Sequence, residues 1–266
     1  MSELTKRVLF ALPAAVIMLI ITWIGGLFFE ILFGLITLLT IWEIHRILRH
    51  TNDRDLFPLS LLVALMVWFF SDFPMLAMYA VSGLVILVSL LAFIYVRYEF
   101  PRRWFATLFS GIYAPVGFLM IVLIRDLGTG IDGFWLVITF FLMIWGNDVF
   151  AYFGGKKFGR RKLAPGISPN KTIEGFWFGF LGSAVGFLIV WLIADPYPLS
   201  IHALLPSVLL IGLLGPIGDI SASRLKRLAN VKDSSTLLPG HGGFFDRFDS
   251  MLLSAPFIYF LYYLIL

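Results

Sequence analysis

Long runs of apolar residues restrict the fold of this chain more than any other feature of its sequence. A helix that crosses a lipid bilayer needs about 20 mostly apolar residues, and the sequence holds about nine such runs. They lie at about 8–24, 27–44, 56–72, 75–96, 105–125, 133–153, 175–194, 201–222 and 251–266. Hydrophobic residues make up 60% of the chain and charged residues 14%, whereas soluble domains average about 45–50% and about 25%. The sequence therefore predicts an all-α, polytopic integral membrane protein with about nine transmembrane helices.

Between these runs the sequence shows no soluble domain, no low-complexity linker and no internal repeat. We expect one continuous membrane domain, in which residues 1–104 form the N-terminal transmembrane helices. Residues 105–266 form the C-terminal helices and carry the polar motifs described below. No small-residue cleavage site follows the first run, so we expect that helix to be retained. The chain has no cysteine, which excludes disulfides, thiolate metal sites and cysteine nucleophiles.

The positions of the basic residues predict which side of the membrane each loop faces. With nine spans, every Lys and Arg except Arg125 falls before the first span or in the loops that follow spans 2, 4, 6 and 8. Because basic loops stay in the cytoplasm, these loops and the N-terminus are predicted to be cytoplasmic. The predicted location is the cell inner (plasma) membrane. The net charge of +4 belongs to these loops, so we expect membrane lipids as partners and no nucleic acid.

The first unusual polar segment, residues 147–175, joins spans 6 and 7. Asp148 follows an apolar run, and a carboxylate at the edge of hydrocarbon is a functional candidate by default. Asp148 and Tyr152 share one helical face, next to Asn147. Residues 168–172 are typical of a helix N-cap, where free amides and Lys171 would suit an anion. The alternative is a capped helix start beside a solvated loop.

The second polar segment, residues 218–249, is denser. One stripe of a helix at the end of span 8 carries Asp219, Ser223, Lys226 and Arg227. Asp246 and Asp249 stand at the start of span 9, after a turn that contains Gly242 and Gly243, whose amides could surround an anion. Ser223 is more often a residue that bonds the carbonyl four positions earlier than a nucleophile. His241 is equally suited to bind phosphate and to make a structural hydrogen bond.

Carboxylates beside lysines, arginines and a glycine turn indicate one kind of chemistry. Mg²⁺ prefers oxygen ligands and uses one or two carboxylates together with substrate phosphates. Basic side chains then neutralise the rest of a polyphosphate. The segments therefore favour metal-assisted phosphoryl or nucleotidyl transfer at the cytoplasmic face. Zinc is not expected, because no two of the four histidines are paired in a loop with these acids. Glu30 and Glu43 in the second span are expected to lie at the interface or to be paired within the bundle.

Residues 223–249 also resemble the complete signature of the phosphatidate cytidylyltransferases, or CDP-diacylglycerol synthases. The matching pattern is Ser223-x-Leu225-Lys226-Arg227-x4-Lys232-Asp233-x-Ser235-x2-Leu238-Pro239-x-His241-Gly242-Gly243-Phe244-x-Asp246-Arg247-Phe248-Asp249. The segment 147–175 is similar to a second block of that family. The N-terminal half resembles the family only in having several spans.

The resemblance implies the reaction of CTP with phosphatidate to give CDP-diacylglycerol and pyrophosphate. It further implies Mg²⁺ as cofactor and an enzyme that forms a homodimer. The implied metal ligands are Asp219 and Asp246. The implied catalytic residues are Asp219, Asp246, Lys226, Arg227 and Ser223. The implied substrate-binding residues are Asn147, Asp148, Tyr152, Lys171, Lys232, His241, Gly242, Gly243, Arg247 and Asp249.

Two other functions remain open from the sequence. A CTP-dependent polyprenol or phytol kinase shares parts of the second polar segment and would phosphorylate a lipid alcohol, although the full pattern at 223–249 argues against it. A secondary transporter of an anionic solute would have polar residues or broken helices near the middle of the bilayer. Here the polar residues gather at one face instead.

Overall fold

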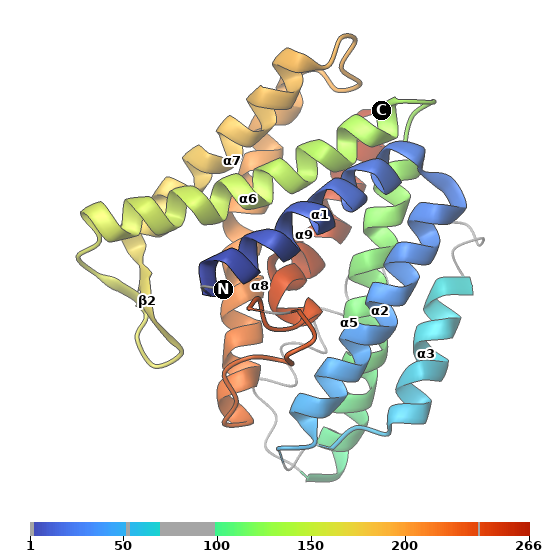
Figure 1. Cartoon of the computed structure of the whole chain (residues 1–266), viewed down its shortest axis with the longest axis vertical. Coiled ribbons are helices and arrows are strands. Elements are labelled where there is room, and N and C mark those ends of the chain that lie inside the picture. Colours follow the sequence, from blue (N-terminus) through green and yellow to red (C-terminus); the bar gives the residue numbers. More distant parts are fainter. Residues whose placement is uncertain (1–2, 52–53, 70–98, 239) are drawn as a thin grey trace.

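The computed structural model describes residues 3–51, 54–69, 99–238 and 240–266, and these are almost entirely helical (Figure 1). The helices are α1 (Glu3–Ile24), α2 (Gly26–Leu48), α3 (Phe57–Phe69), α5 (Glu99–Asp126), α6 (Asp132–Phe158), α7 (Ile173–Ile193), α8 (Leu204–Leu228) and α9 (Phe244–Ile265). A short 3₁₀ helix, η2 (Ile201–Ala203), precedes α8. The strands β1 (Lys162–Ala164) and β2 (Ser168–Thr172) form an antiparallel hairpin between α6 and α7. The predicted all-α class is confirmed for the described residues.

Six helical segments of the described residues are long and apolar enough to cross a membrane. They are Gly26–Leu48, Arg103–Asp126, Asp132–Phe158, Ile173–Ile193, Ile201–Leu228 and Phe244–Ile265. Helices α1 and α3 add the shorter apolar stretches Leu12–Ile24 and Phe57–Trp68. The span expected at 75–96 lies outside the described residues. A multi-pass membrane architecture is therefore confirmed, while the total of nine spans stays a prediction.

Aromatic side chains join α2, α5 and α9 in the core. Phe33 of α2 lies between Phe118 of α5 and Phe248 of α9, with ring centroids 5.8 Å and 6.3 Å away. The rings of Phe118 and Phe248 are 5.2 Å apart and nearly perpendicular, an arrangement that aromatic pairs favour. All three side chains are buried. This cluster fixes the start of α9 against α2, which places the second polar segment next to the N-terminal half of the chain.

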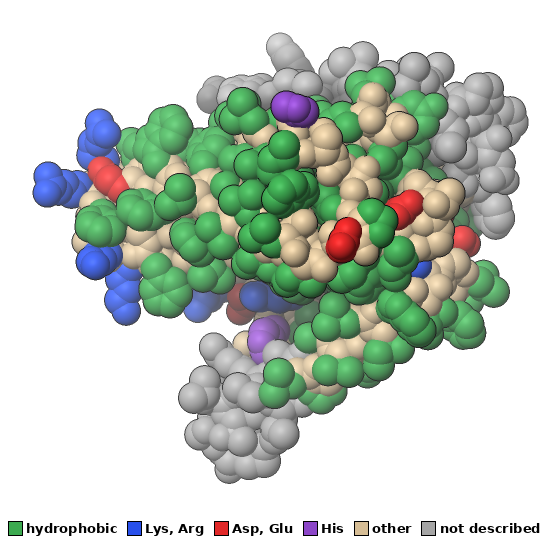
Figure 2. All heavy atoms as spheres, turned by 90° about the horizontal axis from the view of Figure 1, so that it is seen from above, with side chains coloured by type: hydrophobic (Ala, Val, Ile, Leu, Met, Phe, Trp, Pro, Cys, Tyr) green, Lys and Arg blue, Asp and Glu red, His purple; other side chains and the backbone are tan. Residues whose placement is uncertain are grey.

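Helices α6 and α7 pack together by close approach of their backbones. A Cβ atom added to Gly182 would lie 2.0 Å from the backbone oxygen of Gly146, so only glycine fits there. Small residues permit such contacts between membrane helices, which gain van der Waals packing from them. Figure 1 shows the two helices side by side, with the hairpin at their shared end. Figure 2 shows Lys and Arg side chains gathered at one end of a largely apolar face.

Two local predictions differ from the structure. Residues 168–172 form strand β2, and only Thr172 acts as the expected N-cap, where its Oγ1 accepts a bond from the Gly175 amide at 3.1 Å. Helix α9 begins at Phe244 rather than near residue 251. Asp246 and Asp249 therefore lie on the first turns of a helix, and their directions are set by that helix.

Candidate active site

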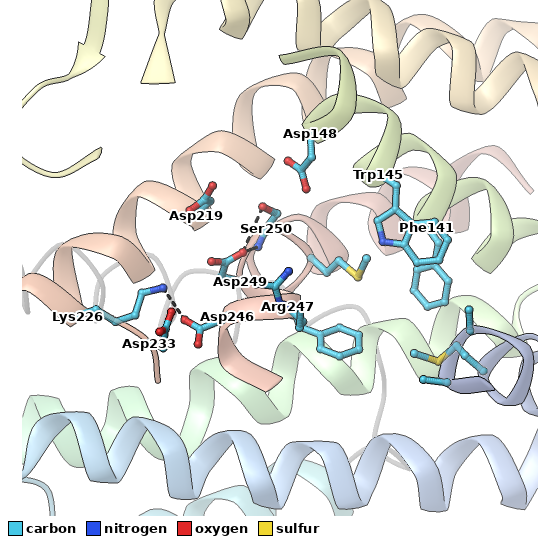
Figure 3. A pocket seen from close by; sticks show the side chains of 15 residues that line it. Phe141, Trp145, Asp148, Asp219, Lys226, Asp233, Asp246, Arg247, Asp249 and Ser250 are labelled. Atoms are coloured by element: carbon cyan, nitrogen blue, oxygen red, sulfur yellow. Dashed lines mark hydrogen bonds and ion pairs between the residues drawn. The ribbon is translucent and has the colours of Figure 1, made fainter. Parts of the chain in front are cut away.

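Five carboxylates line one cavity of about 530 Å³ (Figure 3). They belong to Asp148 of α6, Asp219 of α8, Asp233 of the following loop, and Asp246 and Asp249 of α9. A Cβ atom added to Gly218 would lie 2.5 Å from the backbone oxygen of Asp249, so α8 and α9 nearly touch beside Asp219. Asp148 and Asp249 both lie within electrostatic range of Asp219. Like charges so close together repel one another, which makes the cavity a site for cations.

Two lysines, one from the hairpin and one from α8, pair with the acids around this cavity. Lys171 of β2 forms an ion pair with Asp219. The Nζ of Lys226 lies 2.5 Å from Oδ1 of Asp246, and the Asp246 side chain is only 5% exposed. Arg247 also lines the cavity. The site thus holds alternating charges, as a pocket for a metal–polyphosphate requires.

A second cavity of about 580 Å³ lies beside the first and shares Asp148 and Asp219 with it. Its walls come from the end of α6, the hairpin and the start of α7. The predicted site residues Asn147, Tyr152 and Lys171 line it. Further lining residues that sequence reasoning did not select include Lys156, Lys162, Asn170 and Phe176. Both cavities fall within the usual size of small-molecule sites, about 300–1,000 Å³.

One wall of the first cavity is apolar. It is formed by Ala14, Ala15 and Met18 of α1 together with Phe141 and Trp145 of α6. The α1 residues are more than a hundred positions from the polar segments, and no local pattern in the sequence connects them. The cavity therefore has a charged end at the aspartates and an apolar end between α1 and α6.

Several predicted residues lie outside both cavities. The Ser223 hydroxyl donates to Oδ1 of Asp219 at 3.3 Å, so it bonds the side chain four positions earlier rather than the expected carbonyl. Arg227 is exposed and donates to the backbone oxygen of Val231 at 3.2 Å. Arg227 is therefore turned away from the stripe formed by Asp219 and Lys226. The remaining predicted residues that line neither cavity are Lys232, His241, Gly242 and Gly243.

The glycine turn before α9 supports Asp246 instead of lining a cavity. Gly242 has a φ of 80°, which a residue with a side chain rarely adopts. Its carbonyl accepts a bond from Leu238, which closes the turn. The amide of Gly243 donates to Oδ2 of Asp246 at 3.0 Å. The turn therefore fixes the direction of the Asp246 carboxylate.

The donor atoms suit a metal ion that arrives with its substrate. Within the described parts of the chain, no group of three or more His, Cys, Asp or Glu side chains could hold a metal ion alone. Mg²⁺ needs only one or two carboxylates when phosphate oxygens and water complete its shell. Asp219 offers such a carboxylate, with 32% of its side chain exposed. Both oxygens of Asp246 already accept protein bonds, so Asp246 would bind a metal only after Lys226 moves away.

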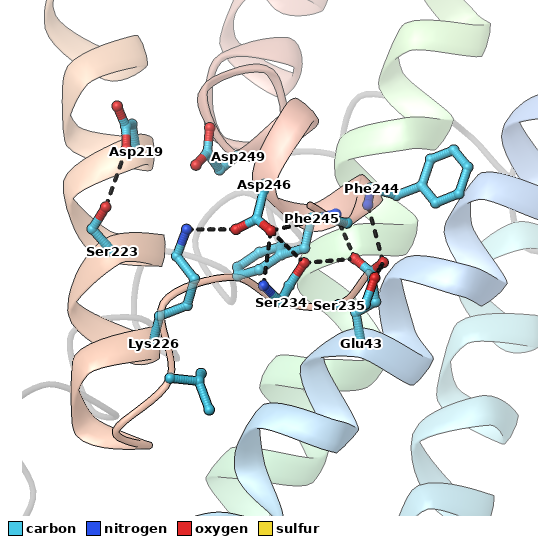
Figure 4. Close-up of polar contacts among 12 residues, drawn as sticks. Glu43, Asp219, Ser223, Lys226, Ser234, Ser235, Phe244, Phe245, Asp246 and Asp249 are labelled. Carbon is cyan, nitrogen blue, oxygen red and sulfur yellow. Dashed lines mark hydrogen bonds and ion pairs between the residues drawn. The ribbon is translucent and has the colours of Figure 1, made fainter. Parts of the chain in front are cut away.

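Sequence reasoning gave Glu43 no role in the site. Figure 4 shows its carboxylate next to the loop before α9, within the same network as Asp246. Glu43 is fully buried and is bonded to Ser234, Ser235 and the first amides of α9. The expectation that Glu43 is paired within the bundle agrees with this. The sequence did not indicate the partners, since they lie about 190 positions away.

Comparison with known proteins shows which family the chain resembles over nearly its whole length. The pattern of the cytidylyltransferase family matches residues 5–265. The chain is 35% identical over 273 aligned residues to the phosphatidate cytidylyltransferase of Bacillus subtilis (strain 168), with 98% of each chain covered. It is 33% identical over 270 residues to the phosphatidate cytidylyltransferase of Brucella abortus biovar 1 (strain 9-941), covering 97% of this chain and 93% of that one. A phosphatidate cytidylyltransferase of Staphylococcus haemolyticus (strain JCSC1435) is 38% identical over 61% of this chain and 60% of its own.

Proposed function

The chain belongs to the cytidylyltransferase family, and on that premise we propose that it transfers the cytidylyl group of CTP to phosphatidate. It is a nucleotidyltransferase of phospholipid biosynthesis, and its product is CDP-diacylglycerol. The second product is pyrophosphate. The observation that carries this proposal is the acidic cluster shared by two cavities, one lined by three lysines and the other reaching an apolar wall.

Each cavity suits one substrate. The cavity beside the hairpin has lysines for a triphosphate, and asparagine and aromatic side chains for a nucleoside. Lys171 lies where it could move from Asp219 to a phosphate oxygen. The other cavity places Arg247 and Lys226 near the charged end, where the phosphate of phosphatidate would bind. Its apolar wall at Phe141 and Trp145 would contact the glycerol and acyl chains.

The reaction needs no protein nucleophile. An oxygen of the phosphatidate phosphate attacks the α-phosphorus of CTP, and the bond from that phosphorus to the oxygen bridging to the β-phosphate breaks. The protein holds the two phosphates in line and neutralises their charge, which is most of what phosphoryl transfer requires. Lys226 and Arg247 hold the attacking phosphate, while Lys171 holds the leaving pyrophosphate. Ser223 orients Asp219 through its hydrogen bond.

Mg²⁺, when bound to CTP, would supply the charge that stabilises the departing pyrophosphate. Asp219 and Asp246 are the proposed ligands, and Asp148 and Asp249 line the same cavity. Asn147, Tyr152 and Asp148 are assigned to the nucleotide. Arg227, at the end of α8, acts on the site through the position of that helix. The loop residues that act through the position of α9 are Lys232, His241, Gly242 and Gly243.

Labelled CTP distinguishes this function from the lipid kinase. The purified protein is incubated with Mg²⁺, phosphatidate and CTP that is labelled on either the α- or the γ-phosphate. The proposal expects the α-label, and not the γ-label, in the lipid phase, because the cytidylyl group contains the α-phosphorus. A parallel incubation with a polyprenol or phytol in place of phosphatidate supplies the alcohol to which a kinase would move the γ-label. A lipid phase that carries only the γ-label would refute the proposal.

The remaining parts of the proposal concern the assembly. The active site faces the cytoplasm, which is supported by the basic residues around it and by the need for cytosolic CTP. The N-terminus lies on the same side, and nine spans cross the membrane. The homodimer rests on the family resemblance. Crosslinking in native membranes, read as a band of twice the monomer mass, tests it.

A further inference from the structure

Glu43 is a buried carboxylate near the C-terminal end of α2, about 190 positions before its hydrogen-bond partners. Its exposed fraction is 0%. A carboxylate removed from water costs several kcal/mol unless hydrogen bonds replace its hydration. In the network around Glu43 those bonds come from a single region, the loop and helix start at residues 234–245. The partners of Glu43 therefore show what this residue holds in place.

The carboxylate of Glu43 caps the N-terminus of α9. Its Oε1 accepts from the amide of Phe244 at 3.0 Å, and its Oε2 from the amide of Phe245 at 2.7 Å. The N-cap residue is Gly243, which has no side chain to serve these amides. A Cβ atom at that position would lie 2.3 Å from Oε1 of Glu43. The glycine thus makes room for a cap supplied by another helix.

Ser234 extends the network from Glu43 to the site. Its hydroxyl lies 3.0 Å from Oε2 of Glu43 and 2.9 Å from Oδ2 of Asp246. The amide of Ser234 also donates to Oδ2 of Asp246, at 2.8 Å. Asp246 then pairs with Lys226 through its other oxygen. Polar contacts therefore connect α2 to α8 without interruption, through Ser234 and Asp246 (Figure 4).

Ser235 offers a natural comparison with Ser234. Its hydroxyl donates to Oε1 of Glu43 at 2.6 Å. Both serines are buried, and both hydroxyls lie within hydrogen-bond distance of Glu43, although the single hydrogen of the Ser234 hydroxyl is shared between Glu43 and Asp246. Only Ser234 also contacts Asp246. A comparison of variants at the two serines can therefore distinguish an effect on the loop alone from an effect on Asp246.

We infer that Glu43 is a positioning residue for the transfer reaction, because it fixes the direction of the Asp246 carboxylate through Ser234 and the start of α9. This inference rests on the proposed function. It adds a residue from the N-terminal half of the chain to the machinery, outside both polar segments. Glu43 does not touch either cavity, so its effect passes through the groups that it orients.

The test compares Ser234→Ala with Ser235→Ala, and both with Glu43→Gln. Each purified variant is assayed for cytidylyl transfer while Mg²⁺ is titrated, and its thermal unfolding is recorded. Ser234→Ala is expected to lower kcat about tenfold and to raise the Mg²⁺ concentration for half-maximal rate several-fold, because Asp246 loses a buried bond. Ser235→Ala is expected to stay within about twofold of the parent in both quantities. Glu43→Gln places an NH₂ group against hydrogen-bond donors, and we expect a loss at least as large as that of Ser234→Ala.

The outcomes separate the inference from the proposed function. If the two serine variants behave alike in the Mg²⁺ titration, Glu43 and its serines are only structural and the inference is overturned. The same holds if Glu43→Gln retains full activity. If Glu43→Gln fails to fold, the comparison of Ser234→Ala with Ser235→Ala still tests the inference. If the parent protein transfers no cytidylyl group at all, the proposed function fails first and the inference falls with it.

Discussion

Two lysines in this site neutralise carboxylates that are proposed to bind a metal ion together with the substrate. Lys171 neutralises Asp219, and Lys226 neutralises Asp246. Each pair joins two different elements, so the charges also hold those elements together. A polyphosphate that enters with its metal offers a new partner to both members of each pair. At the scale of single residues, the proposed function therefore requires each lysine to exchange its carboxylate partner for a phosphate when the substrate binds.

The central residue-scale prediction concerns Asp219. Asp219→Asn keeps the shape of the side chain but removes its charge, and kcat is expected to fall about 100-fold or more because a metal ligand is lost. The melting temperature should change by no more than about 3 °C, since the lost ion pair is partly exposed. Initial rates with α-labelled CTP and a thermal scan measure both. Asp195→Asn, in a loop after α7, is the control, and turnover of Asp219→Asn equal to this control would refute the metal role.

A second prediction concerns Lys171. Lys171→Met is expected to raise the KM for CTP about tenfold, because a phosphate loses a charged partner. The KM for phosphatidate should stay within about twofold. Lys157→Met is the matched control, since Lys157 is exposed on the same basic end but lines neither cavity. Equal KM values for CTP in the two variants would remove Lys171 from the nucleotide site.

At the scale of elements, the base of the β1–β2 hairpin is bonded to the first turn of α7. The carboxylate of Glu174, on the first turn of α7, accepts bonds from the amides of Arg160 and Arg161 at 2.9 Å and 3.2 Å. These bonds tie the end of α6 to α7 at the base of the hairpin. Lys171 on β2 is thereby directed toward Asp219. The bonds at the base of the hairpin therefore help to set the position of Lys171.

Glu174 therefore provides an element-scale prediction. Glu174→Ala removes the oxygen that accepts both bonds and is expected to raise the KM for CTP about threefold to tenfold. Glu174→Gln keeps an amide oxygen that can accept both bonds, so its KM should stay closer to that of the parent. A series of CTP concentrations at saturating phosphatidate gives the values. Equal KM values in the two variants, which both lack the charge, would show that charge, and not the position of the hairpin, is what matters.

Local patterns predicted some of these elements and missed others for a physical reason. The helical spacing placed Asp219 and Lys226 on one face, because that spacing depends on one continuous helix. The strand at 168–172 forms by pairing with 162–164, and the start of α9 depends on a cap from Glu43. The partner of the strand is only a few residues away, but its short, mostly polar sequence carries no alternating pattern. The cap comes from about 200 positions away, and the apolar wall from α1 likewise depends on residues that meet only after folding.

At the scale of the whole molecule, Lys and Arg side chains gather at one end (Figure 2). The end of α6 and the segment that leads into the hairpin carry exposed Lys156, Lys157, Arg160, Arg161 and Lys162. Arg125, the one basic residue that the nine-span topology assigns to the outer side, donates to the backbone oxygens of Thr22 and Trp23 at 2.7 Å and 3.1 Å. These bonds tie α1 to α5. Every other Lys and Arg falls in the segments predicted to be cytoplasmic, which is the distribution that the positive-inside rule expects.

This separation predicts which loops a reagent outside the cell can reach. The chain lacks cysteine, so one introduced thiol is the only target for a maleimide. Ser200→Cys lies before η2, on the predicted outer side, and Asn170→Cys lies on the hairpin; both residues are exposed. A membrane-impermeant maleimide is expected to label Ser200→Cys in intact cells, and Asn170→Cys only after permeabilisation, because basic loops stay inside. Retained cytidylyl transfer by each variant controls for folding, and labelling of Asn170→Cys in intact cells would place the active site on the wrong side for cytosolic CTP.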